Sequence, residues 1–211
     1  MPSIGTLSLG GVPRVALAVA KSEDPALKGV RTRGVDVLEA RLDLWRKDSS
    51  YVSASLTRLK ALGLPILLTC RLRSEGGSWH GTENARIKLL LGHLKYADAV
   101  DIELLAADSI REVSREVLRA DKTLLISNHS MTATPKDAEL EIRFDAAKRL
   151  GAHIVKLACL ARDGNDMLRL LALVWRRRRE GVIGISMGPK GALSRTAAPH
   201  FGSLLTYAGQ K

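Results

Sequence analysis

Charged residues interrupt several apolar runs of this sequence, and they fall late in each run. Glu39, Arg41 and Asp43 alternate in one run, and Asp101 and Glu103 alternate in another. Alternation with a period of two puts such side chains on one face of a strand. Because charges are tolerated in a buried strand only when they are paired or functional, these residues are candidates for a site.

One lysine suggests a specific chemistry. Lys156 lies inside the run His-Ile-Val-Lys-Leu-Ala, where a lysine is costly to bury. Burial disfavours the ammonium and leaves some neutral amine, which is a nucleophile toward a carbonyl group. Condensation gives a Schiff base, and its protonated iminium acidifies the neighbouring carbon. His129, which follows another apolar run, could move that proton if the two side chains are in contact.

Each of these residues also has an ordinary interpretation. An alternating Glu-x-Arg-x-Asp is typical of a solvated strand face, and a histidine after a strand is usually a loop residue. The functional interpretation is favoured because further candidate residues also fall at or after the end of an apolar run. Arg71 ends one run, Met187 ends another, and Arg195 lies in the loop after Met187.

Short apolar runs that suit buried strands recur along the whole chain. Helical patterns fill most of the gaps between them, one capped by Thr82 and one with Pro135 at its first position and Gly151 after its end. The runs span 15–20, 35–44, 65–70, 99–105, 123–127, 153–160, 182–187 and 203–208, and the helical patterns span 53–62, 82–96, 108–119, 134–150 and 166–180.

Strand–helix alternation predicts an α/β fold with a parallel sheet and right-handed crossovers. Eight repeats predict closure into a compact (β/α)8 (TIM) barrel, whose active site would lie at the C-terminal ends of the strands. An open doubly wound sheet is the alternative, but the turn after the first long strand, residues 21–25, lacks the expected glycines. Residues 6–9 with Gly10 and Gly11 predict a short N-terminal strand or hairpin at the lower end of the barrel.

Composition limits the classes of protein. The 211 residues suit one domain over 1–211, and 33 Lys and Arg against 22 Asp and Glu give a net charge of +11. This charge suits nucleic acid, a membrane surface or an acidic substrate, but only 4% of residues are aromatic and available to stack on bases. Arg176–Arg179 best support nucleic-acid binding, yet they lie where a helix is predicted to end and cations complement its dipole.

The same sequence predicts a cytoplasmic protein without membrane contact. It shows neither an apolar stretch long enough to cross a membrane nor the pattern of a signal peptide. Cys70 and Cys159 lie inside apolar runs, so we expect buried thiols in a reducing compartment.

Several short segments carry a resemblance when they are taken in order. They are Glu39-Ala40-Arg41-Leu42-Asp43, Thr69-Cys70-Arg71, Glu75-Gly76-Gly77, Asp101-Ile102-Glu103, Ser127-Asn128-His129, Val155-Lys156-Leu157-Ala158, Ile185-Ser186-Met187-Gly188 and Gly191-Ala192-Leu193-Ser194-Arg195. Together they resemble the type I 3-dehydroquinate dehydratase family of the shikimate pathway, over about residues 13–207. No single segment is very specific, and the fixed order of so many carries the resemblance. The (β/α)8 fold of this family agrees with the predicted barrel.

The resemblance implies roles for individual residues. Lys156 would form an imine with the substrate ketone, His129 would act as general acid and base, and Glu75 would orient His129. Water would be lost from 3-dehydroquinate to give 3-dehydroshikimate, in aromatic amino-acid biosynthesis, with no cofactor or metal. The remaining residues would be a carboxylate clamp (Arg195), hydroxyl-binding residues (Glu39, Arg41, Arg71), a pocket wall (Met187) and supporting residues (Asp101, Glu103).

The C-terminal residues depart from the family pattern. Family members carry Ser-x-Pro-Gly-Gln after the eighth strand and then an eighth helix, whereas here Tyr207 is followed by Ala-Gly-Gln-Lys. We therefore expect a barrel that lacks its final helix, with Gln210 as the candidate for the glutamine that closes on the substrate. The uncovered seam near the eighth and first strands would be covered by a partner subunit, as in a homodimer, or by the N-terminal segment.

Three different functions remain open on the sequence alone. Another Schiff-base barrel lyase, such as a class I aldolase, would share the strand lysine, but it would not predict the Glu-Gly-Gly, Asn-His and Ser-Arg set together. The second is a basic nucleic-acid-binding protein, and the third is an inactive barrel.

Overall fold

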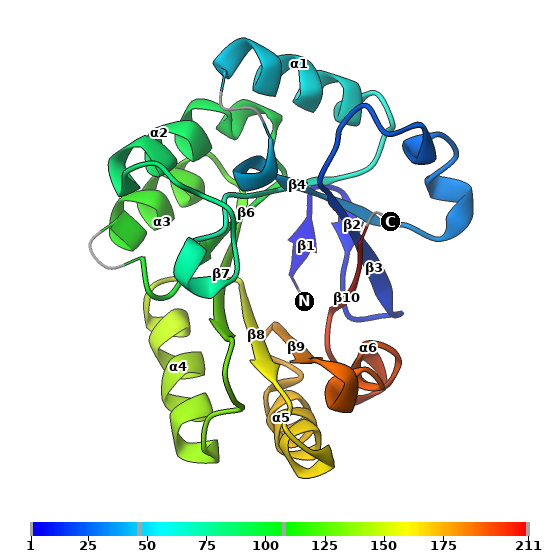
Figure 1. The fold of residues 1–211 in the computed structure, drawn as a ribbon, viewed down its shortest axis with the longest axis vertical. Coiled ribbons are helices and arrows are strands. Elements are labelled where there is room, and N and C mark those ends of the chain that lie inside the picture. The colour runs from blue at the N-terminus through cyan, green and yellow to red at the C-terminus, as the bar shows by residue number, and fades with distance from the viewer. Residues whose placement is uncertain (1, 46–47, 107–108, 210–211) are drawn as a thin grey trace.

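A computed structural model describes residues 2–45, 48–106 and 109–209. Eight parallel strands surround a central axis; β3 to β9 pair in chain order, and β10 pairs with β3 (Figure 1). This confirms the (β/α)8 barrel, since a doubly wound sheet would reverse its strand order. The strands are β3 (Arg14–Val19), β4 (Val37–Arg41), β5 (Ile66–Thr69), β6 (Ala99–Glu103), β7 (Thr123–Ser130), β8 (Ile154–Leu160), β9 (Val182–Met187) and β10 (Leu205–Gly209).

Hydrogen bonds between β9 and the two residues just before β10 close the ring. The backbone N–H of Leu204 donates to the carbonyl of Val182 at 2.9 Å. The hydroxyl of Ser203 accepts the N–H of Gly184 at 3.2 Å. A serine side chain therefore replaces one backbone partner at the closing seam.

Helices cover the outside of the barrel and pack on the outward faces of the strands (Figure 1). Thr82 caps α2 by accepting the N–H of Ala85, as predicted. Between β3 and β4 two 3-10 turns stand in place of a helix. The helices are α1 (Ser49–Lys60), α2 (Glu83–Gly92), α3 (Ser109–Arg119), α4 (Asp137–Arg149), α5 (Gly164–Arg177) and α6 (Ser194–Ala197), and the 3-10 turns are η1 (Pro25–Leu27), η2 (Arg31–Arg33), η3 (Leu42–Leu44), η4 (Arg73–Glu75), η5 (Leu94–Tyr96), η6 (Pro189–Gly191) and η7 (Ala198–Phe201).

Two predicted helix starts were wrong. Helix α1 begins at Ser49 rather than at residue 53, because the Asp48 side chain caps it. Helix α4 begins at Asp137, so Pro135 precedes the helix. The Arg169 side chain donates to the carbonyls of Pro135 at 2.6 Å and of Thr134 at 3.2 Å, which holds both residues in the loop between β7 and α4.

The lower half of the barrel interior is an apolar layer closed by the N-terminal hairpin. Strands β1 (Ser3–Ile4) and β2 (Leu7–Ser8) pair antiparallel and lie inside the ring of strands (Figure 1). Ile4 and Leu9 are buried against this layer, which confirms the predicted hairpin. Each of the eight strands contributes at least one buried residue, and these include Ala16, Val37, Leu67, Ala99, Leu125, Ile154, Ile183 and Leu205.

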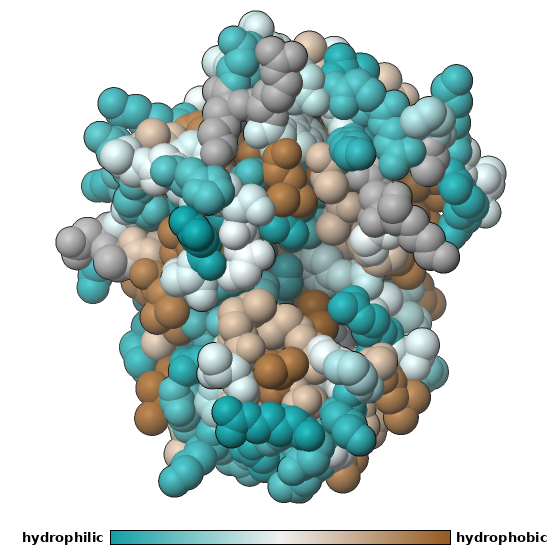
Figure 2. Space-filling view, viewed as in Figure 1, coloured by the Kyte–Doolittle hydropathy of each residue, from teal (hydrophilic) through white to brown (hydrophobic). Residues whose placement is uncertain are grey.

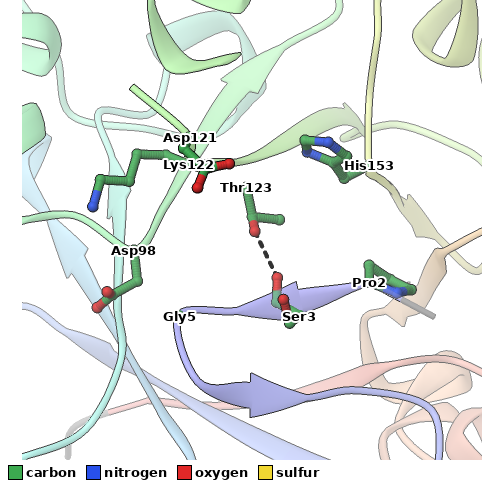
Figure 3. A pocket seen from close by; sticks show the side chains of 8 residues that line it. All are labelled: Pro2, Ser3, Gly5, Asp98, Asp121, Lys122, Thr123 and His153. Carbon is green, nitrogen blue, oxygen red and sulfur yellow. Dashed lines mark hydrogen bonds between the residues drawn. The ribbon is translucent and has the colours of Figure 1, made fainter. Parts of the chain in front are cut away.

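Figure 3 shows how the hairpin is tied to the barrel. The Thr123 hydroxyl, at the start of β7, donates to the carbonyl of Ser3 at 2.6 Å. A cavity of about 330 Å³ lies beside this contact, lined in part by Asp98, Lys122 and His153. These residues precede their strands, so this cavity lies at the end of the barrel opposite to the strand ends that carry the candidate site residues.

The N-terminal segment fills the lower end of the barrel and does not lie over the outer face of β3 and β10. Val15 and Leu17 remain partly exposed on β3, and β10 is the last element of the described residues.

Cys70 and Cys159 are both buried thiols, as expected. Within residues 2–45, 48–106 and 109–209, no helix has both the length and the apolar character needed to traverse a bilayer.

Candidate active site

A cavity of about 280 Å³ opens at the C-terminal ends of the strands. Figure 2 shows a central hollow on the face seen in Figure 1, with hydrophilic residues toward its floor. The structure therefore brings together side chains that are far apart in the chain. The sequence-predicted residues that line the cavity are Glu39, Arg41, Arg71, Glu75, His129, Lys156, Met187 and Arg195.

Lys156 reaches the cavity from inside β8 and is only 4% exposed. Its Nζ atom lies 3.4 Å from Oδ2 of Asp101 and 3.6 Å from Oε1 of Glu39. The ring centroid of Tyr207 lies 4.0 Å from the same Nζ atom. Two carboxylates and one aromatic face thus surround the amine, which leaves its remaining side toward the cavity.

His129 and Glu75 form a close pair at the cavity wall. Nδ1 of His129 lies 2.8 Å from Oε2 of Glu75. Burial, together with the positive charges of Arg71 and Lys156, lowers the pKa of His129 well below its usual value. Burial first, and then the charge of Glu103, raises the pKa of Glu75 to about 7. The imidazole is therefore neutral at neutral pH, which is the form that a general base requires.

A buried ion-pair cluster supports the floor of the cavity. Arg71 donates to Oδ2 of Asp101 at 2.7 Å, to Oε1 of Glu103 at 2.8 Å and to Oγ of Ser127 at 2.6 Å. Although burial opposes it, the charges of Arg71 and Lys156 hold the pKa of Asp101 well below its usual range. Arg71 therefore lines the cavity with most of its donors already used by internal partners.

Arg86 is a member of this cluster that sequence reasoning missed. It lies on α2, is fully buried, and donates to Oε2 of Glu103 and to the carbonyl of Cys70, both at 2.7 Å. An arginine on a helix is normally solvated, so its residue type alone gives no signal. Its spacing does give one, because Arg86 lies four residues before Leu90, a buried residue of the same helix.

Arg41 is held by a two-pronged contact with Asp43. Its Nε donates to Oδ1 of Asp43 at 2.9 Å and its Nη2 donates to Oδ2 at 2.8 Å. Strand β4 ends at Arg41 and Asp43 lies in η3, so the predicted strand alternation stops earlier than residue 44. The N–H of Ser78 also donates to Asp43, at 3.0 Å, which connects this pair to the loop after β5.

The Glu-Gly-Gly segment has a steric explanation. Gly76 adopts a φ of +80°, which favours glycine, and it ends the turn η4 that carries Glu75. A Cβ atom on Gly77 would lie 2.1 Å from the carbonyl oxygen of Arg71. The two glycines let the loop approach Arg71 closely enough for Glu75 to reach His129.

Arg195 and Tyr207 are joined at the rim of the cavity. Nη1 of Arg195 donates to the carbonyl of Tyr207 at 2.8 Å, and the hydroxyl of Thr206 donates to the carbonyl of Arg195 at 2.7 Å. Tyr207 lines the cavity and was not predicted as a site residue, because an aromatic residue in an apolar run is indistinguishable from core. Gln210, the candidate lid residue, lies outside the described residues.

Two further observations concern metal and nucleic acid. Over the described ranges, no three His, Cys, Asp or Glu side chains are grouped so that they could hold a metal ion. In the Arg176–Arg179 run, Arg176 and Arg177 both pair with Glu141, and Arg178 lies 3.8 Å above the ring of Trp175. Three of the four arginines in this run thus contact other side chains of the same protein.

The fold and the site define a class of enzyme: a (β/α)8 barrel in which a strand-borne lysine shares a cavity with a histidine–glutamate pair. The chain belongs to the type I 3-dehydroquinase family, whose family profile matches residues 15–210. Membership in this family sets the chain apart from the class I aldolases that share a strand lysine.

Individual relatives agree with the family assignment. The chain is 36% identical to the 3-dehydroquinate dehydratase of Methanococcoides burtonii, over 99% of this chain and 90% of that protein. A crystal structure of 3-dehydroquinate dehydratase from Geobacillus kaustophilus superposes with a TM-score of 0.92 at 29% identity, over 100% and 88% of the two chains. The type I enzyme from Clostridium difficile, solved with covalently modified comenic acid, gives 0.93 at 26% identity, over 100% and 89%.

Proposed function

We propose that this chain dehydrates 3-dehydroquinate to 3-dehydroshikimate through an imine on Lys156, with His129 as general acid and base. The observation that carries the proposal is the meeting of Lys156 with the Glu75–His129 pair in one cavity. The names of the relatives support the substrate, since they are 3-dehydroquinate dehydratases. The imine itself supplies the electron sink, so the proposed reaction uses no metal or organic cofactor.

The first step joins the enzyme to the substrate. The nitrogen of Lys156 adds to the ketone carbon, and the carbonyl oxygen leaves as water. Ammonium and ketone thus give the protonated iminium and one water, while His129 carries protons between nitrogen and oxygen. Glu39 and Asp101, at 3.6 Å and 3.4 Å from Nζ, balance the positive charge on either side of this step.

The second step removes the hydroxyl group. Since Nδ1 of His129 faces Glu75, Nε2 is the nitrogen that takes the proton from the carbon next to the iminium. The C–H electron pair forms an enamine, which then expels the hydroxyl on the next carbon. That hydroxyl takes the proton from His129 and leaves as water. A second water hydrolyses the regenerated iminium, which frees Lys156, so that the net change is the loss of one water.

Substrate binding falls to the residues around the rim. A guanidinium binds a carboxylate through two parallel hydrogen bonds, so we assign the substrate carboxylate to Arg195. We assign the hydroxyl groups to Glu39, Arg41 and Arg71, and the ring face to Met187. Gln210 completes this proposed set, and Asp101 and Glu103 act as supporting residues.

The setting of the enzyme is part of the same proposal. Residues 1–211 form one catalytic domain, which acts in aromatic amino-acid biosynthesis in the cytoplasm. Two buried thiols, Cys70 and Cys159, suit a reducing compartment. We further propose a homodimer that covers Val15 and Leu17, which the N-terminal hairpin leaves partly exposed. Sedimentation equilibrium tests the dimer, and a monomer at micromolar concentration would rule it out.

Trapping the imine tests the proposed chemistry. The protein is incubated with 3-dehydroquinate, reduced with borohydride, and digested for mass mapping. We expect one adduct on Lys156 and enone product in an unreduced sample. Lys156→Met should abolish both, whereas Lys60→Met, at an exposed lysine of α1, should change neither. If the native protein yields neither adduct nor product, the proposal is wrong.

A further inference from the structure

Tyr207 lies against the reacting nitrogen and has no role in the steps described above. Its ring centroid is 4.0 Å from Nζ of Lys156, within the range of a cation–π contact. The contact lies inside the barrel, where little water competes with it, because Lys156 is 4% exposed. A desolvated contact of this kind is the strong form of the interaction.

The hydroxyl group of Tyr207 does not explain the position of the ring. The oxygen atom is buried and has no hydrogen-bond partner among the described residues. Burial, followed by the charges of Glu39 and Asp101, raises the pKa of this hydroxyl well above its usual value. The side chain therefore stays a neutral phenol, and the ring presents an uncharged π face to the lysine.

The backbone holds Tyr207 in this place. The residue pairs with Ala16 of β3, and its carbonyl accepts Nη1 of Arg195 at 2.8 Å. The ring thus belongs to the rigid wall of the barrel rather than to a loop. A rigid ring is prepared for a charge that forms on Lys156 and does not have to reorganise around it.

We propose that Tyr207 is a catalytic residue whose ring face stabilises the positive charge on Nζ of Lys156, above all in the iminium. This inference rests on the proposed imine chemistry. An ammonium has three N–H donors to share between Glu39 and Asp101, whereas a protonated iminium has only one. The single iminium N–H can therefore be directed at only one of the two carboxylates, which lie 3.4 Å and 3.6 Å from Nζ. The π face has no directional donor requirement, so its contribution persists while the contacts to the carboxylates weaken, and it supplies a larger share of the charge stabilisation in the iminium than in the free enzyme.

Ring-preserving and ring-removing substitutions test this role. Tyr207→Phe keeps the ring and removes the unpartnered hydroxyl, so we expect kcat within about threefold of the native value. Tyr207→Leu removes the ring, and we expect kcat and the rate of borohydride-trapped adduct to fall about 10- to 30-fold. KM should change less than kcat, because the lost contact is to the intermediate.

A fluorinated phenylalanine series at position 207 separates charge from packing. Each added fluorine withdraws electron density from the ring face at nearly constant shape, so log kcat should decline stepwise from zero to three fluorines. A flat series would overturn the proposal, even if Tyr207→Leu is slow or does not fold. Equal losses in Tyr207→Phe and Tyr207→Leu would also overturn it and would assign the role to the hydroxyl. If the native enzyme forms no adduct at all, the imine proposal fails first.

Discussion

A single oxygen of Glu75, Oε2, accepts the backbone N–H of His129 at 2.7 Å and lies 2.8 Å from Nδ1 of the same residue. One carboxylate thus fixes both the backbone and the ring of the proposed base. The other oxygen, Oε1, is buried and has no hydrogen-bond partner among the described residues. An incompletely satisfied buried carboxylate gains a proton readily, which agrees with the raised pKa of Glu75.

The pH profile should report this pair. Because the pKa of Glu75 is raised to about 7, the pair takes up a proton below that pH and His129 becomes a weaker base. We expect kcat/KM to decline toward about tenfold per unit below pH 7. Glu75→Gln cannot titrate, so its rate should be lower and that limb should be absent. Initial rates from pH 5 to 9, followed by enone absorbance, measure both profiles, and an unchanged limb in the variant would assign it to another group.

Breaking the buried cluster at Arg71 should cost far more stability than breaking a surface pair. Arg71→Lys cannot reproduce the contacts to both Asp101 and Glu103, so one buried carboxylate loses the partner that neutralises one of its oxygens. We expect the free energy of unfolding to fall by about 3–5 kcal/mol. Arg176→Lys, at an exposed pair with Glu141, should change it by less than about 1 kcal/mol. Urea unfolding followed by circular dichroism compares them, and equal losses would contradict the assignment of the cluster.

Arg195 should govern substrate affinity. Charge-assisted hydrogen bonds contribute about 1.5–3 kcal/mol, so Arg195→Ala should raise KM about 10- to 100-fold with a smaller change in kcat. Arg179→Ala removes an equal charge from an exposed position away from the cavity and controls for the overall field of the protein. Steady-state kinetics at fixed ionic strength measures both variants. A similar rise in KM for Arg179→Ala would indicate long-range attraction instead of a clamp.

The loop after β5 should tolerate no added atom at Gly77. A Cβ there would meet the Arg71 carbonyl oxygen at 2.1 Å, whereas a Cβ at Gly11 has nothing within 4 Å. We expect Gly77→Ala to lower kcat at least about tenfold by displacing Glu75 from His129, and Gly11→Ala to leave kcat unchanged. Kinetics of the two variants tests this, and full activity of Gly77→Ala would show that the loop can move without loss.

The barrel was predictable because its strands are short, apolar and separated by regular helical patterns. Strand β9 spans the predicted residues Val182–Met187, since Gly181 and Gly188 bound it on both sides. The start of a helix was harder to predict where a polar side chain from another element holds the preceding loop. Arg169 holds the loop before α4 from helix α5, 34 residues further along the chain, so the late start of α4 could not be predicted from Pro135.

The residues alone indicated candidate site positions mainly where a charge interrupts an apolar strand, and the role of Glu75 came from the family resemblance. Lys156 and Asp101 conflict with their apolar neighbours, and the conflict itself is the signal. Tyr207 matches the pattern of an apolar strand, and the spacing of Arg86 indicates burial without naming its partners, so the contacts of both emerge from the packing of α2 and β10 around the barrel.

The apolar layer beneath the charged residues separates two tasks along the same eight strands. Residues of this layer hold the ring together two to four positions before the candidate site residues of the same strand, as Ile154 does before Lys156 and Leu125 before His129. A mutation in the apolar layer changes the free energy of unfolding with little effect on the proposed proton transfers in the cavity. The barrel can thus accumulate or lose stability during evolution while the proposed reaction is preserved, and adaptation to a new temperature does not have to pass through the proposed catalytic residues.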